Sequence, residues 1–312
     1  QLDLPGSARR RTVDPVDNRS DIRDFLTSRR ARITPEQAGL LPGGGRRRVP
    51  GLRREEVAVL AGVSTDWYIR LEKGHIAGVS EDVLEAVARA LHLDEAERLY
   101  LFDLARAARP SRVPRRRSRA PVPPRVQWML DSMSASAAFV TNGRMDIVAA
   151  NTLARALYSP VLDEPQWRAN IARFQFLDPR AHEYHSDWDA AANVTVALLR
   201  TEAGRDPYDK DLRELVGELS TVSEEFRARW AAHNVRLHHA GAKQFRHPAV
   251  GHFELVYHTL DLPSEDRGKL ALTIYTAEPG TPSEDGLKLL ASWAATNTAS
   301  TPAPTTPAAD HA

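Results

Sequence analysis

The side chains best suited to chemistry lie in one segment, from Leu52 to Gly74, which reads LRREEVAVLAGVSTDWYIRLEKG. Two arginines, Arg53 and Arg54, stand near its start, and short polar and basic side chains follow from Thr65 onward. Guanidinium groups are always charged and fork toward phosphate oxygens, whereas hydroxyl, amide and charged side chains hydrogen-bond to the edges of bases. This set of side chains is therefore typical of a contact with a nucleic acid.

The spacing within this segment predicts two helices that meet at a tight turn. Such a pair needs a small residue where the backbones approach, a turn residue that adopts positive φ, and apolar residues that lock the second helix onto the first. Ala58, Gly62 and the pair Tyr68 and Leu71 meet these needs in order. We expect a helix-turn-helix whose second helix, residues 65–73, enters the major groove of DNA.

The side chains of this predicted interface divide by role. Arginines before and at the start of the first helix would contact phosphates, and the outer side of the second helix would read bases. Phosphates repel Asp66, so this carboxylate either accepts from a cytosine amino group or complements its own helix N-terminus. For Trp67 the alternative to base contact is half-buried packing. The predicted DNA-contacting residues are Arg46, Arg47, Arg48, Arg53, Arg54, Thr65, Asp66, Trp67, Arg70 and Lys73.

Charge is distributed unevenly along the 312 residues. Residues 1–122 contain 24 Lys and Arg against 17 Asp and Glu, whereas the remainder contains 18 against 24. Such asymmetry indicates a nucleic-acid-binding module joined to a second part. A stretch rich in Pro and Arg separates the two, and it is expected to act as a semi-stiff spacer because proline removes backbone donors and restricts φ. The predicted organisation is a flexible N-terminus (1–18), a DNA-binding domain (19–108), this linker (109–124), a second domain (125–296) and a disordered tail (297–312).

Before the linker, apolar residues recur at helical spacing in five places, which predicts an all-helical first domain. Ser64, Ser80 and Asp94 each precede one of these stripes, where a side-chain oxygen can cap free amides. Glu97 completes a capping box with Asp94.

After the linker the period of the pattern changes. Residues 138–150 are two short apolar runs split by a glycine, which indicates a hairpin. Three helical patterns follow between 187 and 232, and apolar and polar residues then alternate in 251–260 and 269–277. The second domain is expected to be α+β and built on an antiparallel sheet.

Composition and motifs also argue against several classes of function. The chain has no cysteine, so disulfides, thiol catalysis and cysteine-based zinc sites are excluded. No GxSxG turn follows a strand, and the glycines 43–45 lack the Lys and Ser or Thr of a phosphate-binding loop. No apolar run reaches the length of a membrane span, and the start lacks a secretory signal. We expect a cytoplasmic protein that is not an enzyme and has no cofactor.

Six histidines crowd into residues 233–258, a density that raises the question of a metal site. His252 and His258 would share one side of a strand, yet no acidic cluster joins them. Ordinary hydrogen bonding is the favoured interpretation, and no metal is expected. A polar contact to a ligand headgroup and a pH-sensitive interface are the alternatives.

The stretch RRRVPGLRREEVAVLAGVSTDWYIRLEKGH resembles the DNA-binding region of the XRE-type regulators of the MmyB-like family. Four later stretches resemble motifs of the ligand-binding domain of that family: IARFQFLDPRAHEYHSDWDAAA, LVGELSTVSEEFRARWAAHNVR, GAKQFRHPAVGHFELVYHTLDL and LTIYTAEPGTPSEDGLKLLASWA. The resemblance extends over about residues 20–296. It implies a lambda-repressor-like, all-α first domain and a PAS-like, α+β second domain with an apolar pocket for a fatty-acid-like or similar small molecule.

The resemblance also implies which positions could contact that molecule. The ligand-contacting residues that the resemblance implies are Asn151, Asn170, Phe176, Trp188, Trp230, Phe245, His247 and Tyr257, with Arg173 and Arg229 as further motif positions. An alternative is that the second domain recruits a protein partner instead of a metabolite. One helix-turn-helix offers few base-reading side chains, so we expect a homodimer on an inverted-repeat operator of double-stranded DNA.

Overall fold

The computed structural model describes residues 18–40, 51–108, 122–235, 239–263 and 270–299. Contacts divide the chain into two compact units. The first comprises Gln1–Arg112 and Arg200–Arg236, and the second comprises Val113–Leu199 and Leu237–Ala312. The predicted DNA contacts Arg46–Arg48 lie outside the described residues, as do most of the predicted N-terminus, linker and tail.

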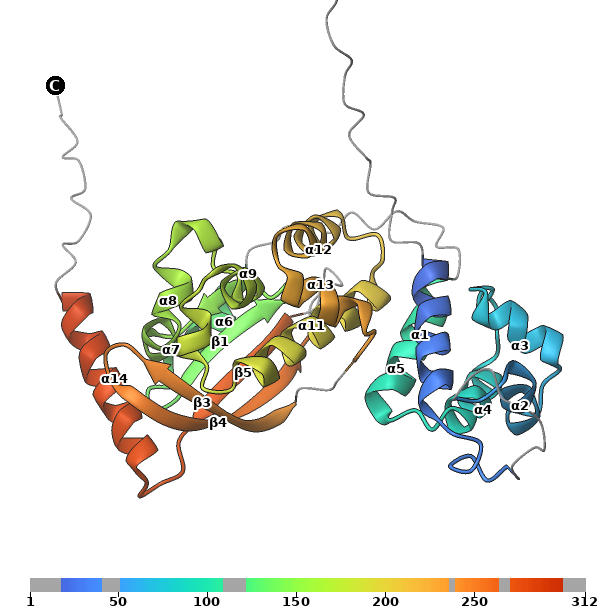
Figure 1. Ribbon diagram of the computed structural model, residues 1–312. Helices are drawn as coiled ribbons and strands as arrows, with labels where there is room; N and C mark the ends of the chain where they lie inside the picture. The colour runs from blue at the N-terminus through green and yellow to red at the C-terminus, as the bar shows by residue number, and fades with distance from the viewer. Residues whose placement is uncertain (1–17, 41–50, 109–121, 236–238, 264–269, 300–312) are drawn as a thin grey trace, which may run out of the picture. The chain divides into compact units, whose positions relative to one another are not determined.

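Five helices form the N-terminal part of the first unit, which confirms the prediction of an all-helical domain (Figure 1): α1 (Asn18–Arg32), α2 (Arg54–Leu60), α3 (Thr65–Glu72), α4 (Glu81–Ala90) and α5 (Glu95–Ala107). Buried side chains from all five, such as Phe25, Tyr68 and Leu104, make one apolar core. Between α2 and α3, Gly62 has a φ of 66°, a left-handed conformation that glycine adopts without strain. The helix-turn-helix geometry is therefore present as predicted.

Two of the three predicted helix caps are formed by side chains. The Ser64 hydroxyl accepts from the Trp67 amide at 3.2 Å. Asp94 and Glu97 make the reciprocal capping box at the start of α5, with distances of 2.9 and 3.2 Å. Ser80 occupies the N-cap position of α4, but its side chain makes no capping hydrogen bond there, so that expectation was wrong.

The remainder of the first unit comes from a distant part of the sequence. It contains the end of α11 (Trp188–Arg205), then α12 (Lys210–Val222) and α13 (Glu224–Ala231). All three were predicted as helices, but within the second domain of residues 125–296. The division by contacts differs because this segment packs on the core of α1–α5, which Val235 joins.

The second unit is built on one antiparallel sheet of five strands: β1 (Ala137–Asn142), β2 (Ile147–Ala150), β3 (Ala240–His247), β4 (Gly251–Leu262) and β5 (Leu270–Thr276). The strand order is β2-β1-β5-β4-β3. The predicted hairpin is β1 and β2, and the two predicted alternating runs are β4 and β5. The sheet and its helices confirm the α+β class.

The two faces of the sheet pack differently. One face carries Phe139, Phe245 and Tyr275 against helices that follow the hairpin and against the C-terminal helix. The other face carries Val140 and Leu272 against the helix that precedes β1. The helices of this unit, besides the start of α11, are α6 (Pro124–Asp131), α7 (Thr152–Leu157), α8 (Ser159–Leu162), the 3-10 turn η1 (Pro165–Trp167), α9 (Ile171–Leu177), α10 (Ala181–Tyr184) and α14 (Pro282–Ala299).

The C-terminal helix α14 continues three residues beyond the point where a disordered tail was predicted to begin, at residue 297. The helix can continue there because each added residue only extends hydrogen bonds already formed, and the first proline, which would break it, is Pro302. None of the helices in the described residues is long and apolar enough to cross a membrane.

Candidate functional sites

The second helix of the helix-turn-helix, α3, has one packed side and one polar side. Tyr68, Leu71 and Glu72 form the packed side and are buried. The polar side carries four of the predicted DNA-contacting residues, all exposed: Thr65, Asp66, Arg70 and Lys73. None of these four side chains makes a hydrogen bond or ion pair with another described residue. Their polar groups are thus available to an external partner.

Trp67 lies between these two sides of α3. Its ring is partly buried and packs against the core of the first unit. This placement is the half-buried packing that stood as the alternative to a base contact. Asp66 lies in the first turn of α3, where its negative charge complements the helix N-terminus.

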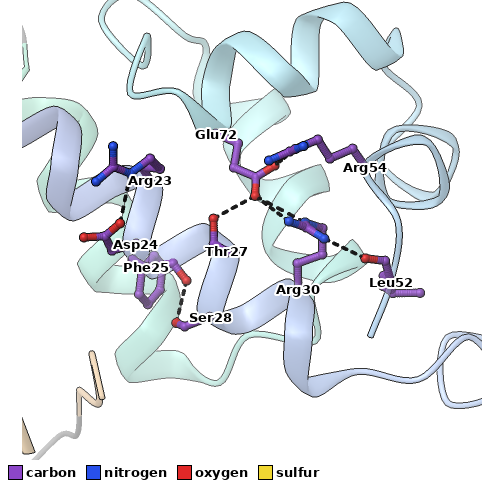
Figure 2. A network of polar contacts seen from close by, with 9 residues as sticks. All are labelled: Arg23, Asp24, Phe25, Thr27, Ser28, Arg30, Leu52, Arg54 and Glu72. Carbon is purple, nitrogen blue, oxygen red and sulfur yellow. Dashed lines mark hydrogen bonds and ion pairs between the residues drawn. The ribbon is translucent and has the colours of Figure 1, made fainter. Parts of the chain in front are cut away.

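A buried carboxylate holds α3 in place. Figure 2 shows Glu72 at the end of α3 surrounded by donors from two other helices. The Arg30 guanidinium and the Thr27 hydroxyl, both on α1, donate to Glu72 Oε1 at 2.8 Å each. On α2, Arg54 donates to Glu72 Oε2 at 2.6 Å. Arg30 also donates to the Leu52 carbonyl at 2.9 Å, which ties the chain before α2 to the same network.

Electrostatics keep this carboxylate charged. Burial alone would raise the pKa of Glu72, but hydrogen bonds from Arg30, Arg54 and Thr27 outweigh it and hold the pKa below its ordinary value of 4.5. The charge of Glu72 therefore stabilises the arrangement of α1, α2 and α3 at neutral pH.

The two arginines predicted to contact phosphates are both at the start of α2. Arg53 is the N-cap residue and lies 3.4 Å from the Glu55 carboxylate. Arg54 is half exposed although its Nε is engaged by Glu72. Arg54 thus presents part of its guanidinium to solvent from a position set by α3, so a phosphate contact and a structural contact are compatible in one side chain.

Three of the predicted ligand-contacting residues use their polar atoms to hold the fold of the second unit. Asn151 caps α7 and donates to the carbonyls of Met133 and Ser136, each at 2.8 Å. Asn170 caps α9 and is completely buried. The two ring nitrogens of His247 are hydrogen-bonded to backbone atoms of the same unit.

Of the five aromatic residues predicted to contact the ligand, four lie in the second unit and one lies in the first. Phe245 and Tyr257 are buried on the face of the sheet that packs against α7 to α10. Phe176 and Trp188 are partly buried and meet edge to face, with ring centroids 5.9 Å apart. Trp230 belongs to the first unit, where it stacks on Phe226, so the structure does not bring it together with the other candidates.

A lysine that the sequence analysis did not single out lies among the aromatic rings of the second unit. The Lys243 ammonium is 5.2 Å from the centroid of the Phe245 ring and 6.0 Å from that of Tyr158. It makes no ion pair with any residue that the structure describes. Burial lowers the pKa of Lys243 to about 7. The signal in the sequence was its position: Lys243 alternates with Phe245 and His247, so all three face one side of β3.

His185 is a second polar group in the same interior. Its side chain is buried, and its Nδ1 has no hydrogen-bond partner among the described residues. Burial, and then the charge of Lys243, hold the pKa of His185 well below its ordinary range. Lys243 and the neutral His185 thus place two hydrogen-bonding groups near each other, and no carboxylate of the described residues pairs with either.

The histidines that raised the question of a metal are dispersed. His247 is hydrogen-bonded to backbone, His252 accepts from Arg246 at 2.7 Å, and His233 belongs to the first unit. His238 lies outside the described residues. Within the described residues, no three His, Cys, Asp or Glu side chains gather as metal ligands would.

The fold and the polar side of α3 define a helix-turn-helix protein that carries a separate α+β unit. A family model described as a helix-turn-helix domain matches residues 21–101. A second, the MmyB-like transcription regulator ligand binding domain, matches residues 122–290, more than half of the chain. The chain therefore belongs to the MmyB-like transcription regulators, as the resemblance of its motifs predicted, with a DNA-binding and a ligand-binding domain. No curated protein matches it.

The Glu72 network yields a stability prediction. Changing Glu72 to Gln should lower the free energy of unfolding of the first unit by about 3 kcal/mol, because it leaves the largely buried Arg30 guanidinium without its counter-charge. The pKa of Glu72 is lower in the folded state, so wild-type stability from this group is full above pH 4.5 and is lost as pH falls below it. Urea unfolding followed from pH 7 to pH 3 measures both effects.

Glu55→Gln is the matched control, because Glu55 is exposed on α2 and its only described partner is Arg53. This variant should stay within about 0.5 kcal/mol of wild type, as surface substitutions usually do. An equal decrease in the free energy of unfolding of the two variants would show that Glu72 has no special role in stability.

Proposed function

We propose that this protein is a sequence-specific, DNA-binding transcription regulator whose second unit senses a small apolar molecule with an anionic headgroup, such as a fatty acid. The observation that carries the DNA-binding part is the exposed polar side of α3, held rigidly by the buried Glu72. In a helix-turn-helix, the residues on that side near the helix N-terminus reach the base edges of the major groove.

The proposed contacts divide into two kinds. Thr65, Asp66 and Arg70 read base edges, and Lys73 extends the same surface of α3. Arg53 and Arg54 bind phosphates and fix the register of the protein on DNA. Each arginine or lysine that neutralises a phosphate adds a salt-dependent increment to the affinity without adding sequence preference.

The chemistry of the proposed ligand follows from the interior of the second unit. Aromatic side chains supply an apolar surface, and the antiparallel five-stranded sheet with helices on both faces supports a PAS-like fold. Lys243 and His185 would receive an anionic group there, since an ammonium without a counter-charge inside a protein is costly and an anion relieves the cost. An apolar molecule with a carboxylate meets both requirements.

The proposed working form is a symmetric homodimer on an inverted-repeat operator. The exposed side of one α3 has four candidate base contacts. At about 1–3 kcal/mol for each good contact, one copy falls short of the discrimination that a genome requires. Two copies related by a two-fold axis would read two half-sites about 34 Å apart or a multiple of that distance.

The base-reading role of Arg70 can be tested against the phosphate role of Arg53. Selection from randomised duplexes should show that Arg70→Ala changes the preferred sequence and costs about 1–3 kcal/mol on the wild-type site. Arg53→Ala should weaken all duplexes alike and reduce the slope of log K against log salt by about 1. An unchanged sequence preference in the Arg70 variant would remove that residue from the readout.

The role of Lys243 can be tested by thermal stability with palmitate as the probe. Wild type should gain stability with palmitate and less with hexadecanol, which lacks the carboxylate. Lys243→Met should weaken palmitate binding about tenfold or more, the worth of a charge-assisted hydrogen bond, and leave hexadecanol binding unchanged. The matched control is Lys210→Met, because Lys210 is exposed on α12.

The pH dependence of the same binding has a definite sign. The pKa of Lys243 in the free protein is about 7, so its ammonium is charged below that pH and neutral above it. Palmitate affinity should therefore fall as pH rises from 6 to 9, and the Lys243→Met variant should lose this dependence. If no fatty acid binds to the wild type, recruitment of a protein partner becomes the better account of the second unit.

The oligomeric state is tested by sedimentation of the full chain at micromolar concentration, with and without palmitate. A dimer that binds a palindrome much more tightly than a single half-site is the expected result. A monomer in both states, with equal affinity for the palindrome and the half-site, would contradict the proposal.

A further inference from the structure

The segment 200–236 has two assignments that differ. The family match places it inside the ligand-binding domain, since that match runs from residue 122 to residue 290. The packing places Arg200–Arg236 in the same compact unit as the helix-turn-helix. We call this segment the arm. Its role is inferred below from its contacts with α1 and α5, all of which lie within the first unit.

Arg200 anchors the start of the arm. Its side chain is 1 % exposed, although it carries a charge that no solvent can screen. The guanidinium lies over the Trp230 ring at 4.1 Å, and it donates to the Trp230 carbonyl and, at 2.9 Å, to His233 Nδ1. Its nearest carboxylate is that of Asp21 on α1, at 3.8 Å. Arg200 thus ties the start of the arm to its end, and the ion pair with Asp21 links both to α1.

The end of the arm makes a second set of contacts with α1. Arg29, also buried, donates to the His233 carbonyl at 2.5 Å and pairs with Glu97 of α5 at 2.8 Å. Arg32 donates to the Asn234 side chain, and Val235 is buried in the core of the first unit. Burial, and then Arg200, lower the pKa of His233 to about 4, so its imidazole is neutral and can accept from Arg200.

Close packing joins the arm to α5. A Cβ atom placed on Gly204, near the end of α11, would lie 2.2 Å from the Tyr100 ring. The ring cannot yield easily, because Tyr100 is 1 % exposed and packs edge to face on Phe25 of α1. Only glycine at position 204 allows the arm to approach this closely.

The helix α1 connects the arm to the DNA-reading helix. At 3.6 residues per turn, the residues of α1 that contact the arm, Asp21, Arg29 and Arg32, lie on the opposite side of the helix from Thr27 and Arg30. Those last two residues donate to Glu72 of α3. A displacement of the arm therefore shifts a helix whose other side positions α3.

We propose that the arm is an integral part of the DNA-binding unit, in which Arg200 and Gly204 act as positioning residues for the recognition helix α3 through α1 and α5. This inference rests on the proposed function in one respect, the assumption that α3 binds DNA. Because α11 starts at Trp188 in the other unit, it is one of the covalent connections through which that unit would act on α3.

The test compares two glycines of the arm in the full chain. Gly204→Ala places a methyl group against Tyr100, whereas Gly217→Ala, in α12, meets nothing within 4 Å. Hydrogen exchange followed by mass spectrometry should show amides of α1 and α5 exchanging about tenfold faster in the Gly204 variant, with the sheet of the second unit unchanged. The Gly217 variant should match wild type, since alanine suits a helix better than glycine.

A merely structural contact would leave DNA binding intact wherever the protein is folded, so affinity is the second measurement. At a temperature where circular dichroism shows both variants folded, Gly204→Ala should bind a duplex selected by the wild type about tenfold more weakly, and Gly217→Ala should bind it equally well. Faster exchange confined to residues 200–236, with α1, α5 and the affinity unchanged, would overturn the proposal.

Two further variants guard against a trivial failure to fold. Asn234→Ala removes one contact at the exposed rim of the arm and should raise exchange in α1 to a smaller extent. Tyr100→Leu makes room for the added methyl group. The free energy of unfolding of the double variant Gly204→Ala, Tyr100→Leu should therefore fall by less than the sum of the decreases in the two single variants. Additive decreases would contradict the close contact between Gly204 and the Tyr100 ring. If the wild type binds no duplex, the proposed function fails, and exchange in α1 and α5 alone decides whether the arm is integral.

Discussion

The arrangement of the DNA-binding unit depends on one buried charge. Glu72 is the last residue of α3, and a carboxylate out of water must be satisfied by donors or the helix would not stay there. Arg30 and Thr27 reach it from α1, and Arg54 reaches it from α2. Because the donors come from two helices, satisfying this one group sets the position of α3 relative to both.

The same helix, α1, serves two networks. One side supplies donors to Glu72, and the other receives Arg200, His233 and Asn234 from a segment more than a hundred residues later in the chain. Charged groups inside a protein interact in a medium where solvent screens them weakly, so both networks resist small displacements. Through this helix, the segment that contains Arg200 and the helix α3 contact one common partner.

The interior of the second unit, by contrast, contains polar groups without partners among the described residues as well as satisfied ones. Asn151, Asn170 and His247 have their polar atoms satisfied by the surrounding protein. Within the described residues, the buried His185 Nδ1 has no hydrogen-bond partner, and Lys243 makes no ion pair. Sites that break the usual rules of burial at a cost in stability are the places where function is expected. This contrast separates residues of the family motifs that hold the fold from those that would meet a ligand.

The sequence by itself determined the five helices α1 to α5 and the later helices α11 to α13, the turn at Gly62, the hairpin and two further strands, because these follow from local periodicity, capping and positive φ. It did not predict β3 or the short helices α6 to α10. It also marked the exposed side of α3, since a helical repeat places Thr65, Asp66 and Arg70 away from Tyr68 and Leu71. Only the tertiary structure decided that Arg54 is shared with Glu72, that Trp230 and the rest of the arm pack with α1 and α5, and that Lys243 lies among aromatic rings. These facts depend on contacts between residues far apart in the chain, and no local pattern encodes which distant surface a buried arginine or a bare glycine will meet.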